Sequence, residues 1–242
     1  MLFLEQEKRN FVTNRRLGSS LAIVAGAINV AAFMEFGYYC ANMTGNASAL
    51  ALNLQQRKPA EGLHTLELGC CFVLGAIVCT FLVNIGRRRH WRVVYAVSIL
   101  LEAVMLATLG VVDAMGLFTR GSFIPALTLC FLMGLQNATV TRISGSVVRT
   151  THITGMLTDL GMEIADWFDL WRRHVSSEHL LSIRQRLWLH LQIIFCFVGG
   201  GIAGAFAYHA WPAYFLFIVA ILLAACAISS IIANSDSLFS EE

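Results

Sequence analysis

Two short Thr-Gly sequences contain the residues best suited to bind a ligand. They are Thr44-Gly45 and Thr154-Gly155, and each begins a stretch of helical character. A threonine at a helix N-cap accepts a hydrogen bond from a free backbone N–H, and glycine permits close backbone approach. The N-terminus of such a helix offers N–H donors and partial positive charge to an anionic or carbonyl-bearing solute. We therefore predict that these four residues belong to a solute-binding site.

Further polar side chains near these sequences would complete that site. The predicted members are Asn29, Asn46, Gln136, Asn137, Thr141, Thr158 and Asp159, with Ser144, Thr151 and His152 as neighbours. Polar groups in apolar, membrane-embedded segments are costly unless paired, so they indicate function by default. Asparagine and threonine also join helices by hydrogen bonds worth about 0.6–2 kcal/mol each, with no ligand involved. A binding role and a purely structural role remain alternatives for these residues.

Glu102 is the acidic residue that lies nearest the centre of an apolar stretch. A carboxyl group at that depth needs a partner or a proton. Two interpretations follow: Glu102 carries a coupling proton, or it is a glutamic acid hydrogen-bonded within a helix bundle.

Sequence patterns typical of enzymes and metal sites are absent from the chain. It has no HExxH, GxSxG, P-loop or CxxC sequence, and its seven cysteines are an odd number within apolar stretches. We therefore expect no catalytic residues, no metal site and no cofactor. A membrane enzyme would have to use His152, His174, His179 and Asp159 for acid–base chemistry.

The composition is that of an integral membrane protein. Of 242 residues, 57% are hydrophobic and 13% are charged, against about 25% charged in soluble domains. The formal net charge of +2 is too small to indicate a nucleic-acid partner. The lipid bilayer is therefore the expected environment of the chain.

Six segments are long and apolar enough to cross a bilayer, which takes about 20 residues. They are residues 17–39, 66–86, 91–112, 123–143, 187–208 and 211–232. Two other helical stretches do not qualify, because 44–54 is short and 154–173 carries four acids beside one apolar stripe. We expect a single all-α membrane domain over 17–232, with polar ends at 1–16 and 233–242.

The basic residues predict the orientation of these spans. Only Arg57, Lys58 and Arg120 fall on one side, and the other 14 of the 17 Lys and Arg residues fall on the side of the N-terminus. The positive-inside rule places that side in the cytoplasm, so both termini are expected there.

The two halves of the chain, residues 17–112 and 121–232, resemble each other. Residues 26–29 (GAIN) match 134–137 (GLQN), 43–45 match 153–155, 71–75 match 196–200, and 99–103 match 221–225. Each half has three spans and one short helix that begins at Thr-Gly. Because three is odd, the second half would be inverted in the membrane, as in many secondary transporters.

The same motifs resemble those of a known family. The sequence MTGN at 43–46 after a Gly-x-x-Asn helix, GLQNA at 134–138 and TTHITG at 150–155 resemble the YoaK family of bacterial inner-membrane proteins, which contain a domain of unknown function. The resemblance implies a multi-pass protein of the bacterial inner membrane and brings no activity with it. The family commonly has Asp-Ala where this chain has Asn29-Val30, so a titrating carboxylate is missing at that position.

These observations favour a small secondary transporter, or permease, of an anionic or carbonyl-bearing solute. The alternatives are a non-transporting assembly or partner-binding subunit that uses the Gly-rich faces and the 154–173 helix, and a membrane enzyme. A homo-oligomer is compatible with all three.

Overall fold

The structure is a computed structural model that describes residues 11–89, 91, 94–119, 122–144, 150–173 and 177–239. The described residues are helical apart from short connections, as the composition predicts. The helices are α1 (Phe11–Phe36), α2 (Met43–Gln55), α3 (Pro59–Arg88), α4 (Val94–Ala114), α5 (Ile124–Ser144), α6 (Ile153–Arg172), α7 (Ser177–Ala210) and α8 (Pro212–Phe239). His174 and most of the predicted N-terminal segment lie outside the described residues.

Six of these helices, α1, α3, α4, α5, α7 and α8, are long and apolar enough to cross a membrane. Four of them are longer than the sequence predicts, most of all α3, which begins at Pro59 instead of residue 66, and α7, which begins at Ser177 instead of residue 187. Apolar content alone predicts only the part of a helix that lies in lipid. Proline is favoured in the first turn of a helix, and α3 begins with one.

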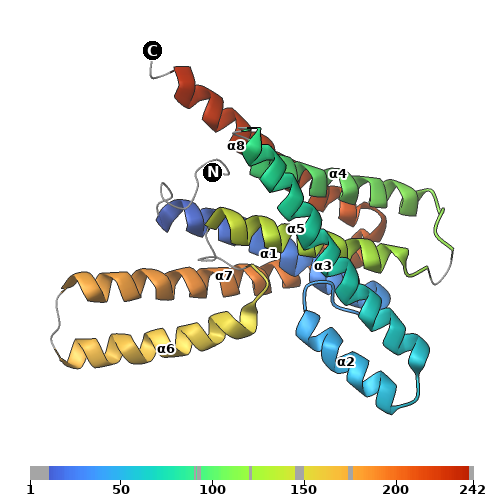
Figure 1. Cartoon of the computed structure of the whole chain (residues 1–242), viewed down its shortest axis with the longest axis horizontal. Coiled ribbons are helices and arrows are strands. Elements are labelled where there is room, and N and C mark those ends of the chain that lie inside the picture. The colour runs from blue at the N-terminus through green and yellow to red at the C-terminus, as the bar shows by residue number, and fades with distance from the viewer. Residues whose placement is uncertain are drawn as a thin grey trace.

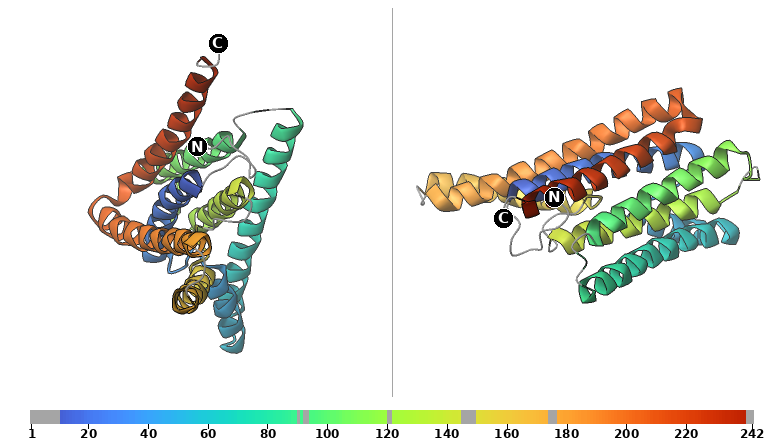
Figure 2. Two further views of the ribbon diagram at one scale, coloured as in Figure 1. Left: turned by 90° about the vertical axis from the view of Figure 1, so that its left-hand side faces the viewer. Right: turned by 90° about the horizontal axis from the view of Figure 1, so that it is seen from above.

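The spans form two layers. In one layer α1 and α5 pack against each other, with α7 on the outer side of α1 and α3 on the outer side of α5. In the second layer α4 packs against α8, which is visible when the bundle is viewed along its long axis (Figure 2, left). The helices α1 and α5 run in opposite directions (Figure 1).

The two short helices each form a hairpin with the helix that follows. α2 packs against α3, and α6 packs against α7. The two hairpins project at opposite ends of the molecule and on the same side of the bundle (Figure 1). Between α6 and α7, the His190 Nδ1 atom lies 3.0 Å from the Glu163 Oε2 atom, and both side chains are largely buried.

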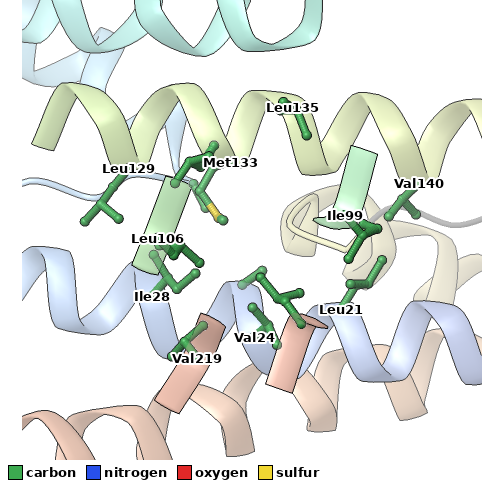
Figure 3. Close-up of a cluster of buried hydrophobic side chains, with 14 of the residues drawn as sticks. Leu21, Val24, Ile28, Ile99, Leu106, Leu129, Met133, Leu135, Val140 and Val219 are labelled. Atoms are coloured by element: carbon green, nitrogen blue, oxygen red, sulfur yellow. The ribbon is translucent and has the colours of Figure 1, made fainter. Parts of the chain in front are cut away.

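The apolar core lies among the inner helices. Leu21, Val24 and Ile28 of α1 face side chains of α4, α5 and α8 (Figure 3). The candidate spans of α1, α4 and α5 are more than half buried within the protein, whereas less than a third of the α3 and α7 spans is buried. The outer helices therefore present most of their apolar surface outward, which suits contact with lipid.

Glycines bring the helices of the first layer into backbone contact. A methyl group at Gly26 on α1 would overlap the carbonyl oxygen of Phe197 on α7, and one at Gly200 on α7 would overlap that of Ile23 on α1. Small residues at helix interfaces allow this close packing in membranes, where no hydrophobic force drives helices together.

The α3–α5 pair is built in the same way. A methyl group at Gly75 on α3 would overlap the carbonyl oxygen of Phe131 on α5, and one at Gly134 on α5 would overlap that of Phe72 on α3. Both outer helices are thus held to an inner helix by a reciprocal pair of glycines.

Candidate functional site

The start of α2 differs from the prediction in the residue that caps it. The N-cap is Asn42, whose Oδ1 atom accepts a 3.1 Å hydrogen bond from the backbone N–H of Gly45. Thr44 lies inside the first turn and is exposed. The prediction of Thr44 as the N-cap is therefore wrong. Asparagine satisfies a free N–H as well as threonine does, and Asn42 precedes the helix by one residue.

The prediction of Thr154 as the N-cap of α6 is also wrong. The helix begins at Ile153 with His152 at the N-cap, so Thr154 again lies in the first turn and is exposed. Gly155 has a clear steric role, because a methyl group there would overlap the imidazole ring of His152. Gly45 likewise makes room for the carboxamide of Asn42, whose Nδ2 atom would lie 2.6 Å from a methyl group.

The asparagines of the two Gly-x-x-Asn sequences tie a span to the connection that leads to a short helix. Asn29 Oδ1 accepts a 2.9 Å hydrogen bond from the backbone N–H of Ala41. Asn137 Oδ1 accepts a 2.7 Å hydrogen bond from the Thr151 hydroxyl, and its Nδ2 atom donates to the carbonyl oxygen of Met133 at 2.8 Å. These contacts favour the structural interpretation of both asparagines.

The other predicted site residues are spread over several elements. Asn46 is buried and its Nδ2 atom donates a 2.9 Å hydrogen bond to the Tyr39 carbonyl oxygen. Thr158 and Asp159 are exposed on α6, and Thr141 is half-buried on α5. The structure therefore does not gather the predicted residues around a single space.

Three fully buried polar side chains, those of Gln136, Glu102 and Thr150, have atoms without a partner in the described part of the chain. Gln136 on α5 donates from Nε2 to the Leu21 carbonyl oxygen on α1 at 3.4 Å, whereas its Oε1 atom is unpaired. Both carboxyl oxygens of Glu102 on α4 are also unpaired. A hydrogen-bonded glutamic acid was one expectation for Glu102, and no hydrogen bond of that kind is present among the described residues.

A cavity of about 440 Å³ lies where α1 and α4 end and α5 and α8 begin. Its walls combine apolar and aromatic side chains with Glu35 of α1, Asp113 of α4 and Tyr208 of α7. The Tyr208 hydroxyl donates a hydrogen bond to a Glu35 carboxylate oxygen. The volume of the cavity is within the range of small-molecule sites.

None of the predicted solute-binding residues is among the described lining of this cavity. Asp113 and Tyr208 are far from Glu35 in sequence, so spacing along the chain could not connect them. The only sequence feature that marked Glu35 and Asp113 was their position near the ends of apolar segments.

A second hollow of about 680 Å³ lies between α2 and α3 and is mostly apolar. Asn46 and Thr65 are the hydrogen-bonding side chains among its described lining. Neither cavity includes a described residue of α6 in its wall, so the expected shared space between the starts of α2 and α6 corresponds to neither. No group of three or more metal-ligating side chains was found among the described residues.

Comparison with known proteins places the chain among membrane proteins. Residues 17–229 match the model of DUF1275, a protein family of unknown function. The UPF0700 transmembrane protein YoaK of Bacillus subtilis (strain 168) is 26% identical over 152 residues, which are 61% of this chain and 65% of that protein. The matched region therefore spans a little under two thirds of that relative. No solved structure matches. The expected likeness to YoaK is confirmed, and the chain is a multi-pass membrane protein.

Proposed function

Because this chain belongs to the DUF1275 family, whose members have no assigned function, we propose a function from its own residues: a small secondary transporter built from two inverted repeats. The repeats are residues 17–112 and 121–232. The cavity among α1, α4, α5 and α8 is the open half of its solute pathway.

The pairing of helices supports the repeat. If α1 to α4 are exchanged with α5 to α8, the α1–α7 pair becomes the α5–α3 pair, and the α2–α3 hairpin becomes the α6–α7 hairpin. The α4–α8 pair maps onto itself, because each of its helices takes the place of the other. A set of contacts that maps onto itself in this way is expected for a pseudo-two-fold arrangement.

Individual contacts follow the same exchange. Gly26 and Gly134 are 108 positions apart, and their partners Phe197 and Phe72 are 125 positions apart. The hydrogen bond from Ala41 to Asn29 likewise corresponds to the one from Thr151 to Asn137. These offsets agree with the sequence matches from which the repeat was predicted.

The observation that carries the transporter proposal is that, among the described residues, equivalent positions of the two halves differ in their access to a cavity. Ile28, Ala31, Ala32 and Glu35 of α1 line the cavity. Glu35 is exposed, whereas the residue 108 positions later, Ile143 on α5, is fully buried. Neither Ile143 nor the other equivalent residues, Gln136, Thr139 and Val140, are among the described lining of the two cavities. A protein of two equivalent halves that is open at one end and closed at the other has the geometry of one state of alternating access.

The glycine pairs suggest how the protein would change state. Backbone contact joins α1 and α7 into one tightly packed unit and α3 and α5 into a second one. Rocking of one unit against the other would close the cavity near Glu35 and open the space near Val140. By the positive-inside rule the present cavity faces away from the cytoplasm, in the bacterial inner membrane, with both termini cytoplasmic.

The solute named from the sequence rested on Thr44 and Thr154 as helix caps that meet a shared cavity. Both threonines are exposed, and neither caps its helix. We therefore do not build the substrate on these helix starts, and we take its chemical class from the cavity wall instead.

Cysteine accessibility tests the transporter proposal without a known substrate. In a variant that lacks the seven native cysteines, Glu35→Cys, at an exposed position of the cavity wall, should react with a membrane-impermeant maleimide added from the cavity side. Val140→Cys should react only from the opposite side. A cross-link that traps the protein in one state should lower the labelling of the cysteine that is accessible only in the other state. Leu132→Cys, a fully buried control whose equivalent Val24 does not line the cavity, should stay protected.

Labelling of Val140→Cys from the same side as Glu35→Cys, or its protection under every condition, would contradict alternating access. Reporter fusions after Pro59 and Ser177 test the orientation, because the proposed topology places these positions on opposite sides. Uptake of a panel of organic cations, anions and neutral solutes into proteoliposomes then tests transport itself.

One observation favours a second candidate, a partner-binding subunit. In the described part of the chain α6 packs against α7, and toward its C-terminal end it exposes Trp167, Phe168 and Trp171. A stoichiometric cross-link from Trp171→Cys to another protein, together with no uptake of any solute, would favour this function over transport.

A further inference from the structure

The wall of the cavity among the inner helices has two chemical components. Its bulk is apolar, and four of its side chains are phenylalanines: Phe36, Phe118, Phe123 and Phe215. Its charged groups are the carboxylates of Glu35 on α1 and Asp113 on α4. None of the described lining residues is basic, so these residues give the cavity a negative potential.

Tyr208 holds one of these carboxylates in place. Its hydroxyl donates to Glu35, and its ring packs edge-on against Phe215 at a centroid distance of 5.6 Å. Asp113 lines the same cavity from α4. The two carboxylates therefore border the same space, from different helices, beside an aromatic surface.

From this combination we propose that the cavity binds a small organic cation, an ammonium group attached to an apolar body. The inference rests on the proposed transport function and names its substrate class. A pair of carboxylates at the border of the cavity attracts a cation by opposite charge. Aromatic faces add attraction to an ammonium group and also accept the apolar body.

Two other ligand classes fit the wall poorly. An anion would be repelled by both carboxylates and would find no basic partner among the described lining residues. A bare divalent metal ion requires about six oxygen ligands, and no metal-ligating group of three was found in the described part of the chain. A protonated amine needs only the charge and the apolar surface that are present.

Three probes of one shape test the proposal: benzylammonium, benzyl alcohol and benzoate. Binding is measured by titration calorimetry on the full chain in lipid nanodiscs. We expect benzylammonium to bind, benzyl alcohol to bind at least about tenfold more weakly, which is 1.4 kcal/mol, and benzoate not to bind. Glu35→Gln and Asp113→Asn should each weaken benzylammonium binding by about tenfold or more.

Glu61→Gln is the matched control, since Glu61 is an exposed acid of α3 outside the cavity, and it should bind like the wild type. Ser122→Trp fills the cavity without altering its charge and should abolish binding. Thermal unfolding of each variant without probe shows whether it is folded. Benzoate binding as tight as benzylammonium binding, equal binding of the alcohol, or unchanged affinity in folded Glu35→Gln and Asp113→Asn would overturn the proposal.

The same probes separate this inference from the proposed function. Benzylammonium that binds but never enters proteoliposomes would support the cation site and count against transport. Uptake of another solute class by a protein that does not bind benzylammonium would support transport and overturn the cation site.

Discussion

The hydroxyl of Thr151 donates a 2.7 Å hydrogen bond to the side-chain oxygen of Asn137 on α5. It joins the end of a span to the connection that begins α6. The same relationship occurs in the first half of the chain, where the backbone N–H of Ala41 donates to Asn29 at 2.9 Å. Each asparagine thus ties the residues that precede a short helix to a span of the bundle.

Loss of the Asn137 contact should destabilise the protein. Asn137→Ala removes the acceptor of the Thr151 hydroxyl, and a partly buried donor left unpaired costs about 1–3 kcal/mol. The unfolding free energy in detergent should fall by that amount. Thr158→Val, on the exposed side of α6, should change it little. If Asn137→Ala unfolded like the wild type but bound no solute, Asn137 would have a binding role instead.

Two adjacent glycines of α7 should respond in opposite ways to the same substitution. Gly200→Ala places a methyl group against the Ile23 carbonyl oxygen, so α1 and α7 must separate and the melting temperature should drop. Gly199→Ala meets nothing within 4 Å and should be neutral or stabilising, since alanine favours a helix by about 1 kcal/mol over glycine. Equal effects of the two substitutions would show that the α1–α7 contact is not needed for stability.

Gly75→Ala extends this prediction to the other half. It should separate α3 from α5 and lower the melting temperature about as much as Gly200→Ala, because its methyl group overlaps the Phe131 carbonyl oxygen. Gly69→Ala is the control on the same helix, with nothing within 4 Å. A large effect in one half only would count against equivalent repeats.

Glu102 should react with an apolar carbodiimide that enters through lipid. Its carboxyl group is fully buried, with neither oxygen paired among the described residues, so the protonated form that carbodiimides attack is favoured there. Mass spectrometry should locate the adduct at Glu102 in the wild type and not in Glu102→Gln. Folded Glu102→Gln that loses proton-dependent uptake would support a coupling role, and normal uptake would exclude it.

The stability of the protein should decline at alkaline pH in part because of Cys40. Burial, with a smaller contribution from nearby Cys130, raises the pKa of the Cys40 thiol well above its ordinary value of 9.0. The folded state therefore holds this proton more tightly than the unfolded chain, and its stabilising effect is complete below pH 9.0 and declines above it. Chemical unfolding between pH 8 and 11 should show a shallower decline for Cys40→Ala than for the wild type.

Local patterns in the sequence predicted the elements of this fold well. The six spans follow from runs of apolar residues, and α6 follows from its single apolar stripe, which faces α7 in part. Such patterns depend on near neighbours in the chain and on the length of a bilayer. Within the Gly-rich segment at 199–201, Gly200 contacts α1 and Gly199 does not, a difference that local sequence could not predict.

The helix starts show where local patterns were not enough. Asn42, His152 and the two threonines are all acceptable near a helix N-terminus, so sequence could not decide among residues one or two positions apart. The backbone path of the preceding connection decides it, and Asn29 and Asn137 hold that path from another helix.

The sequence by itself determined that this is a six-span, all-helical membrane protein, because hydrophobicity and length are properties of short segments. Only the tertiary structure decided that Glu35, Asp113 and Tyr208 border one cavity, that Glu102 has no described partner, and that α1 pairs with α7. These relationships join residues far apart in the chain. They depend on which helix surfaces can approach closely enough to pack, which the shapes of whole helices determine.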